Sequence, residues 1–227
     1  MGVIRIEDPC KPLEFDSARP LEIEIGCGKG RFLAGRAAAH PECDFLGIER
    51  MLGRVRLFDG KCRRAGLENV KILRLEALYT LHYLLPAHRA RRVYVFFPDP
   101  WPKRKHRSHR LFGPLFLDAL WKRLEIGGKV EFATDHLEYF ETVCECFDQY
   151  SPEKPKFERT EPMPRPREVW TEFETMFREK GVAVHSAAWK ALPGDDAPLE
   201  PLKIPPELEP REGVVRRCGI ETIGETP

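Results

Sequence analysis

LEIEIGCGKGRFLAGRAAA, residues 21–39, has the pattern of a strand, a glycine loop and a helix in succession. Gly26, Gly28 and Gly30 allow the backbone to turn sharply and a ligand to approach it closely. The helix N-terminus behind the loop offers N–H groups that have no partner within the helix. The third glycine falls one position short of the G-x-G-x-x-G dinucleotide pattern, which argues against NAD. The stretch therefore predicts a ligand-binding unit of an α/β sheet.

Strand and helix patterns alternate from this unit to residue 149. A strand followed by a helix, repeated, implies parallel pairing and a doubly wound, mostly parallel α/β sheet with helices on both faces, as in Rossmann-like folds. The Gly127–Gly128 pair is expected to form a turn that separates a helix from the strand after it. We predict strands near 21–26, 43–49, 69–75, 91–97 and 128–134, and helices near 30–40, 51–65, 76–85, 113–125 and 135–149.

Beyond residue 149 the composition changes. Residues 151–168 are rich in proline and charge and predict a loop, which a helix over 171–180 and a final strand over 181–189 follow. The segment 192–227 has too few periodic apolar residues to pack, so we expect an extended or disordered tail. The chain is thus predicted to form one domain, 1–191, and a Pro-rich tail.

The composition is that of an ordinary soluble globular protein, with 42% hydrophobic and 32% charged residues and a net charge of +1. No apolar run approaches the roughly 20 residues of a membrane span, and a signal-peptide pattern is missing, so we expect a cytoplasmic protein without membrane association. The seven cysteines include no C-x-x-C pair, and we interpret them as structural rather than as metal ligands. Cys144 and Cys146 are the alternative metal pair, without a second pair at zinc-ligand spacing. The oligomeric state is left open.

Three acidic residues lie within or directly after predicted strands. Glu49 ends the second strand, roughly 20 residues past the glycines, where an acid accepts hydrogen bonds from ribose hydroxyls. Glu24 inside the first strand is a costly charge unless donors or a cation, such as a bound sulfonium or ammonium, meet it. Glu76 follows the third strand, where an adenine amino group is expected. The pattern predicts an adenosine-bearing ligand. The alternatives are a purely structural glycine turn, and Glu24 and Glu76 as partly exposed partners of Arg or Lys.

Residues 93–111, VYVFFPDPWPKRKHRSHRL, place one acid beside a cationic arm. The apolar run at 93–97 predicts a buried strand that delivers Asp99 at its carboxyl end, the edge where open α/β sheets bind ligands. Three prolines stiffen the loop around this carboxylate. The stretch from Lys103 to Arg110 contains no acid and suits nucleic-acid phosphates, which points to chemistry on a nucleic acid. The alternatives are Asp99 as a turn residue, a solvated charge run, and Trp101 packing the loop instead of stacking on a base.

Five motifs, EIGCGKG, GIER, FFPDPWPKRKH, ATDH and TEFE, closely resemble in this order those of the bacterial tRNA (guanine-N7)-methyltransferase family over residues 21–191. PDPWPK followed by a basic stretch is highly specific to that family, whereas most S-adenosylmethionine-dependent methyltransferases share the glycine loop. The resemblance implies a class I methyltransferase fold, S-adenosylmethionine as cofactor and tRNA as partner. It also implies the reaction, which is methyl transfer to N7 of a guanine, expected in the variable loop of tRNA, to form 7-methylguanosine.

The resemblance also implies roles for individual positions. The family usually has Asp where this chain has Glu76 and a polar or acidic residue where Leu78 stands, and Ser108 replaces a residue that is often basic. From the residues alone, Asp135 has the alternative role of a helix cap, and T-x-x-E at 171–174 predicts a capping box. By similarity, the cofactor contacts are Glu24, Gly26, Gly28, Gly30, Glu49, Glu76 and Asp99; Asp99 is also the catalytic residue; and Lys103, Asp135, Thr171, Glu172, Phe173 and Glu174 bind the substrate. We expect Arg104, Lys105, Arg107 and Arg110 to contact tRNA phosphates.

Guanine N7 keeps an in-plane lone pair and needs no general base to attack a sulfonium methyl group. The enzyme's task is then to align the reacting atoms and hold the base, which is catalysis by positioning and electrostatics. Asp99 fits either as an acceptor for guanine N–H groups or as a counter-charge to the methylated product. The rival functions are a methyltransferase for another RNA or small molecule, and a catalytically silent RNA-binding module that kept the fold.

Overall fold

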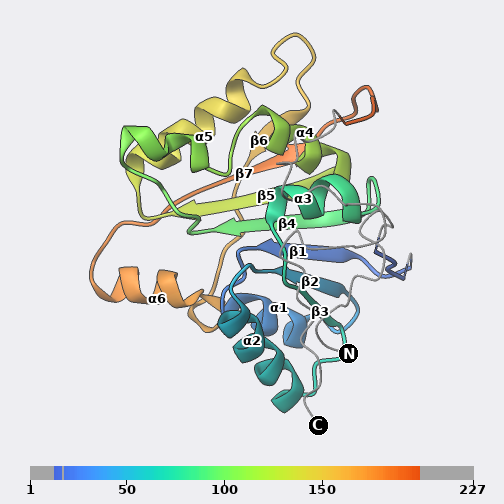
Figure 1. The fold of residues 1–227 in the computed structure, drawn as a ribbon, viewed down its shortest axis with the longest axis vertical. Coiled ribbons are helices and arrows are strands. Elements are labelled where there is room, and N and C mark those ends of the chain that lie inside the picture. The colour runs from blue at the N-terminus through green and yellow to red at the C-terminus, as the bar shows by residue number, and fades with distance from the viewer. Residues whose placement is uncertain (1–12, 17, 200–227) are drawn as a thin grey trace, which may run out of the picture.

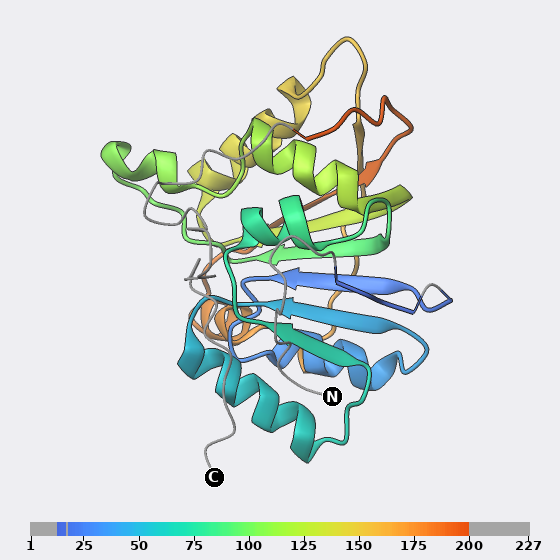
Figure 2. The same ribbon diagram turned by 45° about the vertical axis from the view of Figure 1, so that its right-hand side comes forward.

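The computed structural model of this 227-residue chain describes residues 13–16 and 18–199. A seven-stranded sheet forms its centre, with helices on both faces (Figures 1 and 2). No helix in the described ranges is long and apolar enough to cross a membrane. The strands are β1 Leu21–Ile25, β2 Asp44–Ile48, β3 Val70–Leu73, β4 Ala90–Phe96, β5 Leu124–Thr134, β6 Phe157–Thr160 and β7 His185–Ala191. The helices are α1 Arg31–Ala39, α2 Leu52–Arg64, α3 Ala77–Tyr79, the π-helix η1 Thr80–Leu84, the 3₁₀-helices η2 Arg104–His109 and η3 Arg167–Val169, α4 Pro114–Arg123, α5 Leu137–Gln149 and α6 Glu172–Glu179.

The strand order across the sheet is β3-β2-β1-β4-β5-β7-β6. The strands β3, β2, β1, β4 and β5 are parallel to one another, whereas β7 runs antiparallel to both β5 and β6. The predicted doubly wound, mostly parallel sheet is therefore confirmed. Because β1 pairs with β2 on one side and with β4 on the other, the winding of the chain reverses at β1, and such sheets bind ligands beyond the carboxyl ends of the strands at this point.

Separate apolar cores hold the helices on the two faces of the sheet. On one face η1, α4 and α5 pack against strand residues that include Ile23. The other face holds α1 and α2 (Figure 1), whose buried apolar side chains pack around Phe58. Because side chains alternate along a strand, Glu22 and Glu24 of β1 both point away from the face of Ile23, towards the side that holds α1.

Glu22 is a fully buried carboxylate whose hydrogen-bond partners all come from neighbouring elements of the fold. Arg36 of α1 donates to both of its oxygens at 2.9 Å, and Arg91 and Tyr94 of β4 each donate to one of them at 2.6 Å. Burial opposes ionisation of this carboxyl, but the three donors outweigh it and lower the pKa of Glu22 below its ordinary value of 4.5. Glu22 is thus a structural charge that ties α1 to β1 and β4.

Three elements depart from the predicted ones, two of them in the C-terminal third. Residues 157–160, inside the segment predicted as a loop, form the edge strand β6, because β7 offers backbone partners that a local pattern does not reveal. The last strand lies at 185–191 instead of 181–189. The helix expected at 76–85 is one α-helical turn, α3, continued by the π-helix η1. The helix predicted over 171–180 is confirmed as α6.

The Gly127–Gly128 pair lies inside β5 and does not separate a helix from a strand. β5 already begins at Leu124, and its register with β4 shifts between Ala90 and Arg92. Gly127 accommodates this irregularity with φ +84°, and a Cβ on Gly128 would come within 2.9 Å of a carbonyl oxygen. The glycines therefore permit a bulged continuation of the strand.

Residues 192–199 have no regular secondary structure but contact the body of the domain. Trp121 of α4 donates its indole N–H to the Leu192 carbonyl at 2.9 Å. Asp196 pairs with His88 at 3.0 Å and also with Lys122. This part of the predicted tail lies against α4. The rest of it, residues 200–227, lies outside the described residues.

Candidate active site

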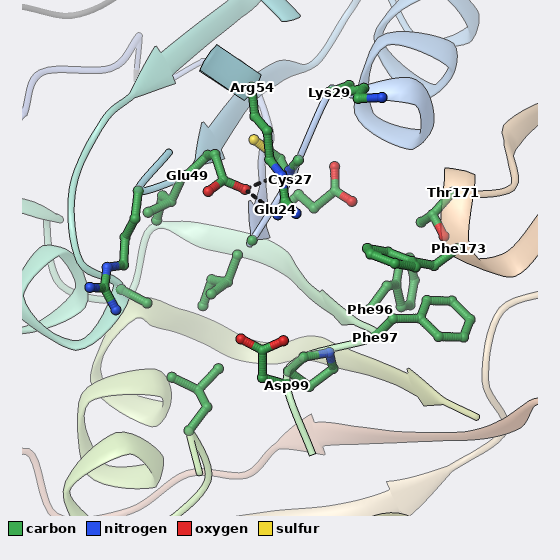
Figure 3. A pocket seen from close by; sticks show the side chains of 18 of the residues that line it. Glu24, Cys27, Lys29, Glu49, Arg54, Phe96, Phe97, Asp99, Thr171 and Phe173 are labelled. Carbon is green, nitrogen blue, oxygen red and sulfur yellow. Dashed lines mark hydrogen bonds and ion pairs between the residues drawn. The ribbon is translucent and has the colours of Figure 1, made fainter. Parts of the chain in front are cut away.

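A cavity of 550 Å³ lies at the carboxyl ends of β1, β2 and β4. Glu24 and Glu49 lie on one side of it, and Asp99 lies across from them (Figure 3). The N-terminus of α6 contributes a further wall. The lining includes Glu24, Gly26, Cys27, Gly28, Lys29, Glu49, Arg54, Glu76, Phe96, Phe97, Asp99, Trp101, His109, Thr171, Glu172, Phe173 and Met176.

The glycine loop turns because three of its residues adopt left-handed backbone. The φ angles are +71° at Gly26, +56° at Gly28 and +67° at Gly30. A Cβ on Gly30 would lie 2.0 Å from the Phe58 ring, so Gly30 shapes the loop from behind and does not line the cavity. A Cβ on Gly26 or Gly28 would meet nothing within 4 Å. Their backbone is therefore open to a ligand on the cavity side.

Glu49 holds the glycine loop to the start of α2. Its side chain is 6% exposed, accepts the Gly28 N–H at 3.1 Å and the Met51 N–H at 2.8 Å, and lies 3.7 Å from Arg54. Each carboxylate oxygen can accept more than one hydrogen bond, so these contacts leave acceptor capacity towards the cavity. The predicted structural role and the predicted ligand role are compatible at this residue.

Glu24 is the second buried acid of β1, and one of its oxygens lacks a partner. Its side chain is 2% exposed, lines the cavity, and has no hydrogen bond to Oε2 from any described residue. Burial, with the nearby charge of Glu172 adding to it, raises the pKa of Glu24 well above its ordinary value of 4.5. An unsatisfied buried carboxyl costs free energy unless a ligand supplies a donor or a positive charge. The alternative of a partly exposed Glu24 is therefore wrong.

Glu76 stands on the rim of the cavity, at the start of α3. Its side chain is exposed, and Oε2 accepts the backbone N–H of Tyr79 at 2.7 Å. This hydrogen bond caps the helix. The capping contact fixes the carboxylate beside the cavity, where a ligand reaches it.

Asp99 lies on the loop after β4, between two residues with strained backbone. Phe97 and Trp101 have φ angles of +53° and +43°, a region that residues other than glycine seldom enter. The carboxylate is exposed and points into the cavity (Figure 3), and no described residue makes a hydrogen bond or ion pair with it. A residue that only shaped the turn would bond to nearby backbone. The loop therefore presents Asp99 to a ligand.

The basic arm begins with three cations that have no acidic partner. Lys103, Arg104 and Lys105 are exposed, and within the described chain none of them forms an ion pair. Arg107 is 51% exposed and pairs with Glu138 of α5 at 3.0 Å. The first part of the arm is thus free to meet phosphates, although Lys103 itself does not line the cavity.

Arg110 is the buried end of the arm. Its side chain is 5% exposed and lies 3.2 Å from Glu138. It also donates to the Pro100 carbonyl at 2.9 Å and to Thr142 Oγ1 at 3.2 Å. These contacts tie the Asp99 loop to α5, and a side chain with this little exposure is out of reach of a phosphate. We therefore remove Arg110 from the phosphate-binding surface predicted from the sequence.

The TEFE segment divides between the cavity and the interior. Thr171 accepts the Glu174 N–H at 3.0 Å, the first half of the predicted capping box. Glu174 does not form the second half of the capping box, because its fully buried carboxylate forms ion pairs with Arg165 at 2.9 Å and with Arg178 at 3.0 Å. Glu174 is thus a structural residue that does not face the cavity. Thr171, Glu172 and Phe173 line the cavity.

Asp135 follows β5 but does not line the cavity. Its alternative role as a helix cap is filled by neighbours, since His136 accepts the Tyr139 N–H at 3.2 Å and Thr134 accepts the His136 N–H at 3.2 Å. Asp135 is half-buried and has no hydrogen bond to another residue in the described chain. Its role in binding the substrate stays a prediction.

Several lining residues were not predicted from the sequence. Cys27 and Lys29 lie within the glycine loop, and Arg54 lies in the first turn of α2. Their closeness to Gly28 and Glu49 in sequence is a signal that could have identified them. His109 lines the cavity only because η2 folds back, which no local pattern indicates. In residues 13–16 and 18–199 no group of three His, Cys, Asp or Glu residues is arranged to hold a metal ion.

Known proteins with similar sequences and folds match most of the described chain. The family described as putative methyltransferase matches residues 18–187. The tRNA (guanine-N(7)-)-methyltransferase of Halorhodospira halophila is 35% identical over 191 residues, 79% of this chain and 78% of that protein. The protein of the same name from Lactococcus lactis subsp. cremoris is 33% identical over 183 residues, 79% of this chain and 83% of that protein. The solved structure of the 16S rRNA methyltransferase KamB superposes with a TM-score of 0.59 at 14% identity, over 78% of this chain and 90% of that chain.

Proposed function

Because the chain belongs to the tRNA (guanine-N7)-methyltransferase family, we propose that it transfers a methyl group from S-adenosylmethionine to N7 of a guanine in tRNA, forming 7-methylguanosine. One observation carries the proposal: a single cavity joins an open glycine loop, the unsatisfied buried carboxyl of Glu24 and the unpartnered carboxylate of Asp99. We place the target guanine in the variable loop, and the enzyme in the cytoplasm with its tRNA.

The glycine-loop side of the cavity fits S-adenosylmethionine. Gly26 and Gly28 leave open space against the backbone, and Oε2 of Glu24 has no donor among the described residues, which such a ligand would supply. Glu49 retains acceptor capacity for ribose hydroxyls, and Glu76 lies on the rim for the adenine amino group. When bound, S-adenosylmethionine supplies a sulfonium methyl group, whose carbon–sulfur bond breaks as N7 bonds to the carbon and the positive charge passes to the purine.

Asp99 holds the target base. Its carboxylate accepts the N1–H and exocyclic N–H groups of guanine, which fixes the base edge and leaves N7 directed at the reacting carbon. The same negative charge stabilises the positive charge that methylation places on the purine. No proton moves in the transfer, so Asp99 needs no base function. Its free carboxylate, held between two left-handed residues, supports this role.

The rest of the tRNA lies along the exposed side of the cavity in this proposal. Lys103, Arg104 and Lys105 meet phosphates, and Arg107 shares its charge between Glu138 and the RNA. The remaining substrate contacts are Asp135 outside the cavity and Thr171, Glu172 and Phe173 in its wall. Glu174 supports these contacts from the interior.

One assay tests the proposal against its rivals. The protein is incubated with labelled S-adenosylmethionine and unmodified tRNA, the RNA is digested, and the methylated nucleoside is identified. We expect 7-methylguanosine, and a tRNA whose variable-loop guanine is replaced by adenine should remain unmodified. A different methylated nucleoside would assign the enzyme to another RNA reaction. Absence of both methylation and cofactor binding would indicate a silent RNA-binding module.

A further inference from the structure

Trp101 differs from the other tryptophans of this chain in its surroundings. Trp189 is 1% exposed and stacks on Phe147 at 3.8 Å in the core. Trp121 and Trp170 donate their indole N–H groups to backbone carbonyls at 2.9 Å and 3.0 Å. Trp101 is 37% exposed, lines the cavity, and donates its N–H to no residue in the described ranges. Its indole is therefore neither buried in the core nor fixed by a hydrogen bond to the described chain.

The basic arm holds this indole in place. His106 and His109 are three residues apart on the 3₁₀-helix η2, so they share one face of it. Their rings lie 5.7 Å and 5.1 Å from the Trp101 ring, tilted by 45° and 49°, and 5.9 Å from each other. The left-handed backbone of Trp101, φ +43°, further fixes its direction. The arm thus has a histidine face that supports the indole.

We propose that Trp101 is the residue on which the target guanine stacks, two positions along the chain from the carboxylate that binds the base edge. This inference rests on the proposed function and adds a contact with the face of the purine ring. The indole lies at the cavity lining with Asp99, on the loop that follows β4. Stacking on an aromatic side chain is worth roughly tenfold to hundredfold in affinity for one base.

The chemistry of the reaction gives this contact a role beyond binding. The face of an indole ring carries partial negative charge and attracts cations. Methylation at N7 converts a neutral purine into a cationic one, so the attraction to Trp101 grows as the methyl group is transferred. An interaction that is stronger in the transition state than in the ground state raises kcat and does not only lower KM. Trp101 therefore contributes to catalysis through the charge on the base.

The test compares Trp101→Phe, which keeps an aromatic face, with Trp101→Leu, which keeps an apolar side chain without one. For tRNA methylation, we expect Trp101→Leu to lower kcat/KM roughly tenfold to hundredfold, with part of the loss in kcat, and Trp101→Phe to retain most of the activity. The affinity for S-adenosylhomocysteine and the melting temperature should stay near those of the wild type in both variants. Equal losses in the two variants, or a kcat/KM within about twofold of wild type for Trp101→Leu, would overturn the proposal.

A second measurement separates this inference from the proposed function. Binding of guanosine monophosphate and of 7-methylguanosine monophosphate is followed by fluorescence quenching with S-adenosylhomocysteine present. We expect wild-type protein to prefer the cationic nucleotide, and the preference and the quenching to shrink in Trp101→Leu. If no 7-methylguanosine forms in tRNA but this preference is observed and depends on Trp101, the proposed function fails and the stacking site stands. If tRNA is methylated but the nucleotide preference and the quenching are the same in Trp101→Leu as in the wild type, the stacking site is wrong and the proposed function stands.

Discussion

The two acids of β1 lie on the same face of one strand, and both are buried, yet their surroundings differ. Glu22, near the start of the strand, has three donors from α1 and β4. Glu24, at the carboxyl end, has an oxygen with no partner in the described chain. The same contrast separates Glu174, which pairs with two arginines, from Asp99, which faces the cavity without a partner in residues 13–16 and 18–199.

The difference shows which charges belong to the fold and which belong to the reaction. A buried charge is tolerated only when it is paired, so an acid whose partners lie within the chain is explained by stability. An acid at the ligand edge without such a partner is explained when the ligand supplies it. Substitutions in the first group should affect folding, and substitutions in the second should affect binding and turnover.

The largest effect is expected for Asp99→Ala. Removing the group that holds the base and balances its charge should lower kcat/KM for tRNA by roughly 10³-fold, while the affinity for S-adenosylhomocysteine stays within about threefold. Nucleoside analysis of methylated tRNA and calorimetric titration measure the two quantities. The melting temperature should not fall, since no described residue bonds to this carboxylate. Methylation near the wild-type rate would remove Asp99 from the catalytic site.

Glu22→Ala should give the converse result. Arg36 and Tyr94 would lose their buried partner, which lowers the free energy of unfolding by about 3 kcal/mol, measured by urea denaturation. Glu22→Gln keeps the shape and some hydrogen bonds and should cost less. Cofactor affinity measured well below the melting temperature should be unchanged. A stability loss under about 1 kcal/mol would mean that the network does not support the sheet.

The sequence was most informative where the structure depends on neighbours along the chain. The glycine loop, Glu49 and the first five strands follow from local patterns, because each element carries its own periodicity or turn residues. The same reasoning missed β6, which forms only because β7 pairs with it, and placed a turn at Gly127–Gly128, where the register of β4 requires a bulge. Long-range pairing decided both cases.

The residues of the candidate site also divide into those that local patterns predict and those that depend on contacts elsewhere in the chain. Glu24 and Asp99 were identifiable because an acid at the end of a buried strand is unusual. Arg110 was misplaced because its partner Glu138 lies on α5, 28 residues further along the chain. Glu174 was misplaced because its pairing with Arg165 depends on how the preceding loop folds against α6, which the local pattern does not reveal. A local charge pattern indicates that a residue is charged, but not whether another part of the chain neutralises it.

The basic arm extends the comparison to cations. Replacing Lys103, Arg104 and Lys105 together by Ala should weaken tRNA binding by roughly tenfold to hundredfold and lower the slope of log affinity against log salt by up to about 0.9 for each lost contact. Filter binding over a salt series measures both. As the matched control, Arg56, Arg64 and Lys180 are exposed, lie outside the cavity lining and form no ion pair within the described chain. Their replacement by Ala should leave the slope unchanged.

Arg110→Ala provides the second control for the arm. Its side chain is committed to Glu138, Pro100 and Thr142, so its loss should reduce the melting temperature and leave the salt slope largely intact. If this variant instead flattens the salt dependence as strongly as the triple replacement, the division of the arm into free and committed cations is wrong.

Glu24→Gln should produce two opposite effects of moderate size. The raised pKa of Glu24 means that folding disfavours its ionised form, and Gln cannot ionise, so the cofactor-free protein should become more stable at neutral pH. The substitution also removes the negative charge offered to the ligand, so affinity for S-adenosylmethionine should fall roughly tenfold. S-adenosylhomocysteine lacks the sulfonium charge. If Glu24 faces that charge, calorimetry should show that the substitution lowers the affinity for S-adenosylhomocysteine less than the affinity for S-adenosylmethionine. The exposed Glu68→Gln serves as control, and both quantities should be unaffected by it.

The smallest effect, the pH dependence of stability, has opposite signs at the two acids of β1. The pKa of Glu22 is lowered, so its stabilisation is present above its ordinary value of 4.5 and is lost as pH falls through the lowered pKa. The pKa of Glu24 is raised, so its contribution to the free energy of unfolding is fully present below 4.5 and is lost as pH rises through the raised pKa. Urea denaturation of the cofactor-free protein across this range measures both contributions. In Glu22→Gln the free energy of unfolding should fall less than in the wild type as pH is lowered. In Glu24→Gln it should fall less than in the wild type as pH is raised. Changes of the same sign in the two variants would mean that both carboxyls are paired alike, which contradicts the assignment of one to the fold and the other to the ligand.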